Sequence, residues 1–308
     1  MDKGYLQISF AWLFAIIVGA FILFLAIYFS SKLINTGNEE ISAKTGKEFG
    51  VLLNPLETGF ESLKSSSILL PIESRIYNKC TLDGVFGRQL IQVSQKSFGK
   101  WTETDLNAGF SNKYIFSENP IEGKRYYILS APFDFPFKVA DLISITSQNK
   151  KYCFQDAPED VADEISKINQ ENLYVNNCSA RKANVIICFG NENGCNVYVD
   201  YNNGIVRKGT DSVYFEGNAL MYSAIFADKA IYECQLKRLM KRVNTLANLY
   251  IDKANFVAGV GCDTNLNVDL LALINAADNF RESSDISSIK LLTDEMNNQN
   301  GVAMCRLW

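Results

Sequence analysis

The hydrophobic pattern begins with a long apolar segment at the N-terminus. Residues 8–29 contain no charged side chain, and a helix of that length extends for roughly 33 Å, enough to cross a hydrocarbon core of about 30 Å. The segment is apolar on every side, whereas a helix of a soluble domain is apolar on one side. We therefore predict a transmembrane helix over 8–29, preceded by a short tail over 1–7.

The next segment keeps helix-forming residues and spaced apolar side chains. This pattern stops at Asn54-Pro55, because proline pushes the preceding residue out of the helical conformation. We predict a juxtamembrane helix over 30–54 that continues the membrane helix, with Gly37 and Gly46 as places where it could break.

A β-rich region follows over residues 65–210. Up to Phe137, short runs of β-branched and aromatic residues are separated by turn-forming pairs such as Asp83-Gly84, which predicts an antiparallel sheet. One helix interrupts the region at "APEDVADEISKIN", where Pro158 and several acidic residues suit a helix N-terminus. Three further strands with turns at Asn193-Gly194 and Asn203-Gly204 predict a meander.

The pattern becomes helical over residues 217–308. Apolar residues recur there at three- and four-residue spacing, which predicts one buried helix face. This face comprises Leu236, Leu239, Met240, Val243, Leu246, Ala247 and Tyr250. Two more helices are expected over 267–280 and 283–298. The predicted fold class is therefore α+β: one transmembrane helix, an antiparallel β-rich domain and a C-terminal helical subdomain.

Cysteine usage indicates the compartment of the domain. All eight cysteines follow the apolar segment, and an even number suits four disulfides in an oxidising space. They are Cys80, Cys153, Cys178, Cys188, Cys195, Cys234, Cys262 and Cys305. Reduced, buried cysteines in a cytosolic domain are the alternative; metal ligation is disfavoured, because there is no CxxC spacing and no histidine. We predict a bond between Cys188 and Cys195, which flank a turn and could close the end of a hairpin.

The orientation of the membrane helix rests on these cysteines. Positive charge is weak on both sides, with Lys3 before the segment and Lys32, Lys44 and Lys47 after it. The cysteines place the C-terminal domain outside the cell, in a single-pass protein of the cell membrane. Asn177 begins the triplet Asn-Cys-Ser and is a candidate glycosylation site in such a domain.

The N-terminus carries a short signal-like motif. Lys3-Gly4 is followed by Gln7-Ile8-Ser9-Phe10 and then by the apolar helix. This arrangement resembles the class III signal of archaeal type IV pilin-like proteins, and it implies a surface protein with a pilin-like anchor. Tyr5 and Leu6 separate the glycine from the glutamine, and Ala11 stands where the family carries an acid. We therefore expect the helix to remain attached as an anchor.

Composition excludes several functional classes. The chain is 47% apolar and has only six prolines, so it contains a real core, and its net charge of −4 disfavours nucleic-acid binding. The absence of histidine excludes Ser-His-Asp and Cys-His nucleophile systems and histidine metal sites. No phosphate-binding loop or dinucleotide motif is present. No catalytic residue, cofactor or metal ligand is predicted.

Two functional hypotheses remain. The first is a non-enzymatic surface protein that binds a partner or joins a pilus-like assembly. The second is a membrane-anchored enzyme that acts on an envelope substrate through carboxylates alone. Its candidate acids are Asp134, Asp141, Asp156 and Asp200.

Two surface features bear on the partner. The densest cationic cluster is Lys237, Arg238, Lys241 and Arg242. It is either a solvated helix face or a site for an anionic partner, such as lipid headgroups of the bilayer or an envelope polysaccharide. The aromatic residues between 116 and 137 are either core residues or a platform for sugar binding.

Overall fold

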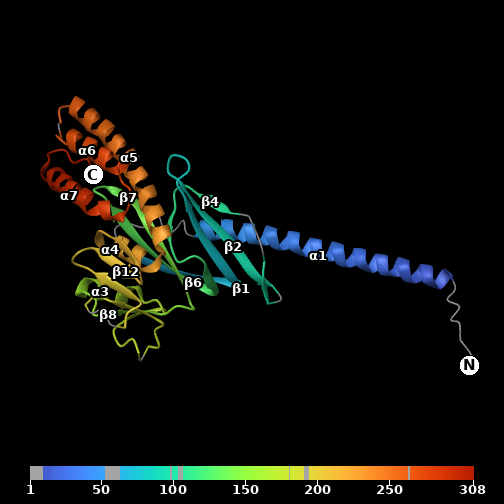
Figure 1. The fold of residues 1–308 in the computed structure, drawn as a ribbon. Helices are drawn as coiled ribbons and strands as arrows, with labels where there is room; N and C mark the ends of the chain where they lie inside the picture. The colour runs from blue at the N-terminus through green and yellow to red at the C-terminus, as the bar shows by residue number, and fades with distance from the viewer. Residues whose placement is uncertain are drawn as a thin grey trace, which may run out of the picture.

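The computed structural model describes residues 10–52, 63–97, 99–102, 107–179, 181–190, 194–262 and 264–308. Within these residues one long helix precedes a domain made of two sheets and a group of C-terminal helices (Figure 1). The predicted α+β class is confirmed.

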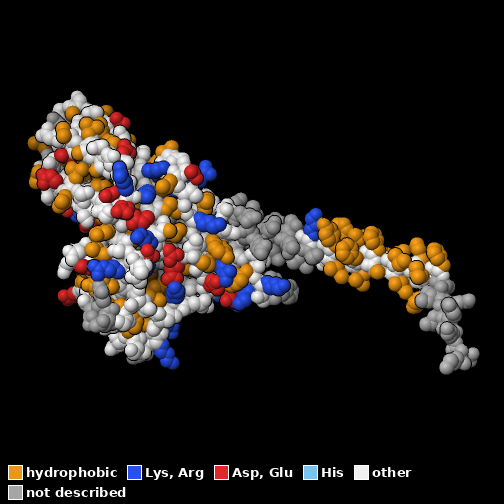
Figure 2. All heavy atoms as spheres, viewed as in Figure 1, with side chains coloured by type: hydrophobic (Ala, Val, Ile, Leu, Met, Phe, Trp, Pro, Cys, Tyr) orange, Lys and Arg blue, Asp and Glu red, His pale blue; other side chains and the backbone are white. Residues whose placement is uncertain are grey.

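Helix α1 (Phe10–Leu52) projects away from the domain as a single element (Figure 1). Its segment Phe10–Ser30 has a mean hydropathy of 2.8 and is 0% buried, and it is the one described helix that is long and apolar enough to cross a membrane. Hydrophobic side chains cover this segment in Figure 2. The helix continues without a break through Gly37 and Gly46, so the predicted membrane and juxtamembrane helices are one.

The first sheet has the strand order β3-β2-β1-β6-β7-β5, and β4 pairs with β2. Its strands are β1 (Lys64–Thr81), β2 (Arg88–Ser97), β3 (Lys100–Trp101), β4 (Ala108–Phe110), β5 (Tyr114–Phe116), β6 (Ile121–Asp134) and β7 (Lys138–Ser147). The long strands pair antiparallel, as predicted. Strand β5 pairs parallel to β7, which the pattern did not predict.

The second sheet has the order β13-β12-β11-β10-β8-β9. Its strands are β8 (Tyr152–Gln155), β9 (Leu173–Val175), β10 (Val185–Cys188), β11 (Val197–Asp200), β12 (Ile205–Lys208) and β13 (Asp211–Tyr214). Helix α3 (Glu159–Ile168) connects β8 to β9 and forms where it was predicted. Because the chain crosses over through this helix, β8 and β9 pair parallel.

The predicted meander is correct only in its second half. Strands β11, β12 and β13 are antiparallel, and the turn before β12 contains Asn203-Gly204. Gly204 has φ +63°, and a Cβ there would lie 2.5 Å from the Phe215 oxygen. Strands β10 and β11 pair parallel, so Cys188 and Cys195 do not close a hairpin. Asn193 lies outside the described residues.

The C-terminal helices are α4 (Gly217–Phe226), α5 (Lys229–Gly259), α6 (Asn267–Asp278) and α7 (Ile286–Val302), with the short helix η1 (Ser283–Asp285) before α7. The predicted face of α5 is buried at Leu236, Leu239, Met240, Val243 and Ala247. Helix α4 contacts strands of both sheets, and Leu220 to Phe226 are all buried. One large core therefore joins both sheets and the helices.

Candidate functional site

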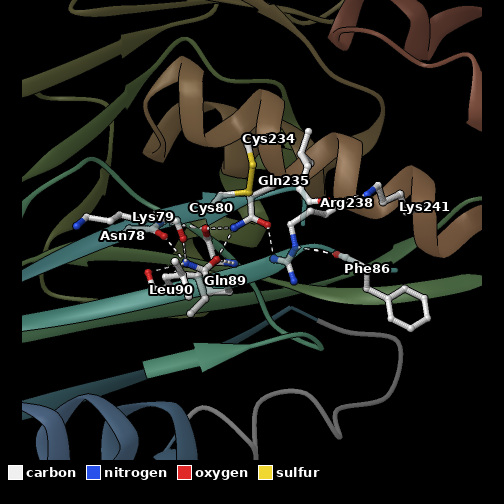
Figure 3. Close-up of a disulfide and its surroundings, with 12 residues drawn as sticks. Asn78, Lys79, Cys80, Phe86, Gln89, Leu90, Cys234, Gln235, Arg238 and Lys241 are labelled. Carbon is white, nitrogen blue, oxygen red and sulfur yellow. Dashed lines mark hydrogen bonds between the residues drawn. A yellow bond between two sulfur atoms is a disulfide. The ribbon is translucent and has the colours of Figure 1, made fainter. Parts of the chain in front are cut away.

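All eight cysteines form disulfides, and among the described residues no cysteine is free. The pairs are Cys80–Cys234, Cys153–Cys178, Cys188–Cys195 and Cys262–Cys305. The predicted bond between Cys188 and Cys195 is confirmed, although it connects parallel strands. Cys80 lies in β1 and Cys234 in α5, so this bond joins the first sheet to the helical region (Figure 3).

Arg238 does not lie on an exposed cationic face, because its side chain is 0% exposed. It donates hydrogen bonds to the carbonyl oxygens of Phe86 (3.1 Å), Ser111 (3.0 Å) and Lys113 (2.8 Å), and to the Gln235 side chain (2.8 Å). Figure 3 shows it extending from α5 toward the first sheet. Burial lowers the pKa of the Arg238 guanidinium. This residue therefore holds the loops of the first sheet against α5.

The other members of the predicted patch are engaged in a similar way. Lys241 donates to the carbonyl oxygens of Leu82 (2.7 Å) and Gly84 (3.2 Å). The Nε of Arg242 donates to the Val139 oxygen (2.6 Å), while Lys237 is half-buried. Burial of Arg238 contradicts an exposed patch of four cations, while Lys237, Lys241 and Arg242 are half-buried. Binding of an anionic partner by these three stays a prediction.

The aromatic run between 116 and 137 belongs to the core. Its rings are buried: Phe116, Tyr126, Tyr127, Phe133, Phe135 and Phe137. A sugar-binding platform made of these rings is excluded. Asn177, the predicted glycosylation site, is exposed and directly precedes the disulfide-bonded Cys178, and its modification stays a prediction.

The four predicted aspartates are divided between the two sheets. Asp134 is the last residue of β6, and Asp141 lies within β7, where it forms a salt bridge with Lys138 at 3.1 Å. Asp156 follows β8 of the second sheet. Asp200 is the last residue of β11 and accepts a hydrogen bond from Asn203 (2.8 Å). The structure therefore does not gather the four into one acid cluster.

A different set of carboxylates lines a hollow of about 250 Å³, namely Asp134, Glu164 and Glu216. Glu164 accepts hydrogen bonds from the Tyr222 hydroxyl (2.6 Å) and the Asn218 amide (3.2 Å). Burial raises the pKa of the Glu216 carboxyl. Sequence analysis assigned neither Glu164 nor Glu216 to a catalytic site, because Glu164 belongs to the acidic first turns of a predicted helix and Glu216 belongs to no motif.

A polar cavity of about 490 Å³, open to solvent, lies between the two sheets, and we call it the intersheet cavity. Tyr152, Val185 and Val197 line it, and each is the first residue of a strand of the second sheet. Lys208, the last residue of β12, lies at the same edge. Open α/β sheets bind nucleotides at the carboxyl ends of their strands, so this cavity lies at the opposite end.

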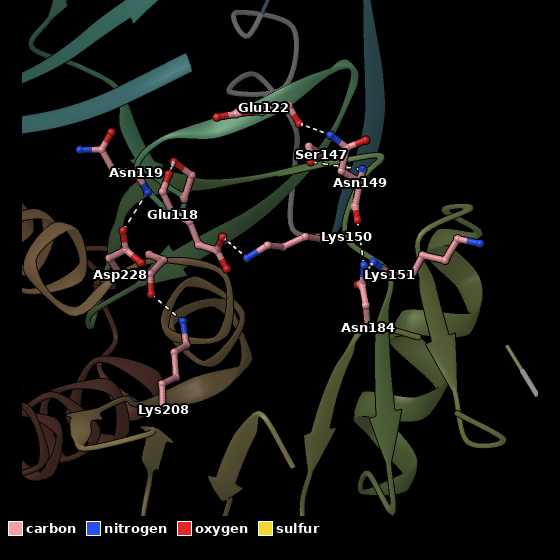
Figure 4. Close-up of polar contacts among 12 residues, drawn as sticks. Glu118, Asn119, Glu122, Ser147, Asn149, Lys150, Lys151, Asn184, Lys208 and Asp228 are labelled. Atoms are coloured by element: carbon pink, nitrogen blue, oxygen red, sulfur yellow. Dashed lines mark hydrogen bonds and ion pairs between the residues drawn. The ribbon is translucent and has the colours of Figure 1, made fainter. Parts of the chain in front are cut away.

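Hydrogen bonds fix the loops around the intersheet cavity (Figure 4). Asn184 accepts a hydrogen bond from the Lys151 backbone (2.8 Å) and donates one to the Asn149 oxygen (2.9 Å). The Asn149 amide donates in turn to the Glu122 oxygen (2.9 Å). A cavity whose walls are fixed in advance loses less entropy when it binds a ligand.

The charged groups of the intersheet cavity differ in their pairing. Lys150 forms an ion pair with Glu118. Lys208 donates a hydrogen bond to the Ala227 oxygen (2.6 Å), and its amine points toward the segment around Asp228 in Figure 4. Burial lowers the pKa of Lys208 to about 8, against the opposing effect of Glu118 and Asp228.

Tyr152 completes the intersheet cavity. Its side chain is 2% exposed, and its ring packs edge-to-face on Phe226 with the ring centroids 5.0 Å apart. Burial, followed by the negative charges of Glu118 and Asp228, raises the pKa of the Tyr152 hydroxyl. Sequence analysis assigned Tyr152 and Lys208 to no site, because a site assembled from separate strands and loops has no local motif.

The fold and the disulfides define a membrane-anchored protein with a disulfide-stabilised α+β domain. The chain matches no known protein-family model, no curated protein and no solved structure.

Proposed function

We propose that this is a single-pass protein of the cell membrane whose C-terminal domain lies outside the cell and binds a partner without catalysis. The observation that carries the proposal is the pairing of all eight cysteines behind one apolar helix. Disulfides form and persist in oxidising spaces, and they are rare in the cytosol. The absence of histidine from the chain also removes the commonest general base.

The orientation can be tested in intact cells that express the full chain. A membrane-impermeant amine-reactive biotin reagent should label the domain before lysis, and protein alkylated at lysis should contain no free thiol by mass spectrometry. Protection of the domain from the reagent, or eight free thiols, would refute the extracellular placement. A cytosolic protein treated in parallel shows that the cells remained intact.

The resemblance of the N-terminus to archaeal pilin-like proteins supports a place for this protein at the cell surface. We propose that it acts as a single anchored molecule, with the helix retained. N-terminal sequencing of protein extracted from membranes should begin at or near Met1. A start at Tyr5 or Gln7 would instead indicate processing and favour a pilus-like assembly.

The enzymatic hypothesis has one observation in its favour, which is the hollow lined by Asp134, Glu164 and Glu216. A half-buried acid with a raised pKa that lines the same hollow as two other carboxylates is one feature that glycoside hydrolysis requires. Turnover of envelope polysaccharide that disappears in Glu216→Gln but not in Glu159→Gln, at an exposed position of α3, would establish this function and refute the non-catalytic proposal.

A further inference from the structure

The intersheet cavity contains hydrogen-bond donors that the described residues leave unused. The Tyr152 hydroxyl forms no hydrogen bond with any described residue, although its side chain is 2% exposed. An ammonium group has three donors, and the described contacts of Lys208 use one of them, on the Ala227 oxygen. Buried polar groups are normally hydrogen-bonded. These donors therefore suit an acceptor that enters the cavity.

The carboxylates around Lys208 have other partners. Lys150 pairs with Glu118, and Glu122 pairs with Arg75. Lys208 forms no ion pair within the described part of the chain: Asp211 pairs with Lys229 at 3.9 Å, and Asp228 accepts a hydrogen bond from the Asn119 backbone (2.8 Å). Both carboxylates still favour the charged form of Lys208. A ligand carboxylate in the cavity would form the direct ion pair that none of these carboxylates forms with Lys208.

The charge of Lys208 also lowers the stability of the fold, and in this it differs from the exposed lysines. Burial disfavours its charged form, and its pKa of about 8 still leaves it mostly protonated at neutral pH. Removing this amine from water costs free energy, which the nearby carboxylates Glu118 and Asp228 offset only in part. The sequence nevertheless carries a lysine here, where methionine would fill similar space at no electrostatic cost, and this favours a role in binding.

The remaining lining indicates the body of the ligand. The Asn196 side chain accepts a hydrogen bond from the Ile186 backbone (2.7 Å), which leaves its amide hydrogens for a ligand hydroxyl. Ile121 and Val197 supply apolar wall. A volume of about 490 Å³ lies within the range of small-molecule sites. Amide donors beside an apolar wall suit a sugar ring, with its hydroxyls and its C–H face.

We propose that the intersheet cavity binds a sugar that bears one carboxylate, a hexuronic acid, whose carboxylate accepts hydrogen bonds from Lys208 and Tyr152. This inference deepens the proposed binding function, which does not depend on it. Free hexuronate and the end of an acidic polysaccharide carry the same group. Tighter binding of tetragalacturonate than of galacturonate would identify the polysaccharide as the source, and equal binding would identify recognition of a single unit.

The test uses the full chain in detergent micelles, titrated with sodium galacturonate and with galactose by calorimetry. Galacturonate should bind about tenfold more tightly than galactose, because an ionic hydrogen bond contributes at least that factor. Lys208→Met should remove this preference, and Tyr152→Phe should weaken galacturonate binding severalfold. The matched control is Lys167→Met, an exposed lysine of α3, which should leave both affinities unchanged.

The pH dependence provides an independent readout. Galacturonate binding should weaken as the pH rises above about 8, because Lys208 then loses its proton. The charged groups that act on this amine are Glu118, Lys150, Asp211 and Asp228. Equal affinity for galactose and galacturonate, no galacturonate binding, or unchanged binding in Lys208→Met would overturn the ligand class. None of these results would affect the cell-surface labelling that tests the proposed function.

Discussion

Arg238 is a buried cation that is held by carbonyl oxygens rather than by a carboxylate. Its guanidinium carbon lies 4.7 Å from the centroid of the Tyr114 ring, and its hydrogen bonds reach three separate carbonyls of the first sheet. Such an arginine holds several chain segments together, because its five donors lie in one plane and satisfy acceptors that would otherwise be buried without a hydrogen bond.

We therefore expect Arg238→Met to lower the free energy of unfolding by about 3 kcal/mol or more, since each buried acceptor left unsatisfied costs about 1–3 kcal/mol. Urea unfolding followed by circular dichroism measures this. Lys237→Met, at the half-buried neighbour, is the control and should change stability by about 0.5 kcal/mol or less. A loss below about 1 kcal/mol in Arg238→Met would show that water replaces the guanidinium.

Gly87 allows Arg238 to approach its loop. It has φ +63°, and a Cβ there would lie 2.5 Å from the Thr81 oxygen and 2.9 Å from Cγ of Arg238. Gly87→Ala should destabilise the protein by about 2–4 kcal/mol, which combines backbone strain with overpacking. Gly84→Ala is the matched comparison: Gly84 has φ +80° but nothing within 4 Å, so only the backbone cost of about 1 kcal/mol applies. Equal thermal shifts in the two variants would refute the steric argument.

Lys208 should make stability depend on pH in a defined window. Its pKa is about 8 in the folded protein and 10.5 ordinarily, so the unfolded chain binds more protons between these values. The free energy of unfolding contributed by this group therefore rises from pH 8 to pH 10.5, by at most about 3 kcal/mol. Lys208→Met should be more stable than the wild type below pH 8, and the difference should shrink across that window. A difference that stays constant with pH would contradict this.

Among the elements, α5 connects the most distant parts of the fold. It carries Cys234 and Arg238 on the side that faces the first sheet, and its C-terminal end leads to Cys262. Gln235, between the first two, donates a hydrogen bond to the Ile115 oxygen at 3.0 Å. A disulfide, a cation and an amide thus act together along one turn of the helix.

The disulfides should differ in their contribution to stability. The Cys80–Cys234 bond closes a loop between residues 154 positions apart, and Cys188–Cys195 closes a loop between residues 7 positions apart. In the chain-entropy model the first stabilises the fold by about 5 kcal/mol and the second by about 2 kcal/mol. The double variant Cys80→Ser/Cys234→Ser should therefore lose more stability in urea than Cys188→Ser/Cys195→Ser. The reverse order would mean that loop length does not govern these bonds.

The elements also show what the sequence could and could not predict. Periodicity predicted α5, α6 and α7 and the antiparallel β1, β2 and β6, because the spacing of apolar residues directly reflects burial of one face. It did not predict the parallel pairing of β10 with β11 or β5 with β7. Strand direction within a sheet depends on the path of the whole chain, which a local pattern does not record.

The candidate site was beyond sequence analysis for a related reason. The cationic cluster on α5 looked like a surface, because charged residues are normally exposed. Arg238 is buried because it finds its acceptors in segments 125 to 152 residues away. The intersheet cavity likewise draws Glu118, Tyr152 and Lys208 from three separate segments. By contrast the disulfide Cys188–Cys195 was predicted, because its two sulfurs are close in sequence.

At the scale of the whole molecule, the domain does not bury the apolar segment of α1. The segment Phe10–Ser30 is 0% buried, and none of its residues belongs to the hydrophobic core clusters. Deletion of this segment should give a protein that stays in the aqueous phase of a detergent partition, whereas the full chain enters the detergent phase. The thermal unfolding midpoint and the four disulfides should be unchanged. A lowered midpoint would show that the anchor helps to hold the domain together.

Because α1 is one unbroken helix, it sets the distance between the domain and the membrane. Beyond Ser30 the helix continues to Leu52, and at 1.5 Å per residue this part can extend roughly 33 Å. The headgroup layer on each face of a bilayer is only about 5–8 Å thick. Strands β2 and β4 contact α1, so the last part of the helix packs on the domain. The stretch of α1 between Ser30 and this contact is thus a rigid spacer that separates the domain from the headgroups.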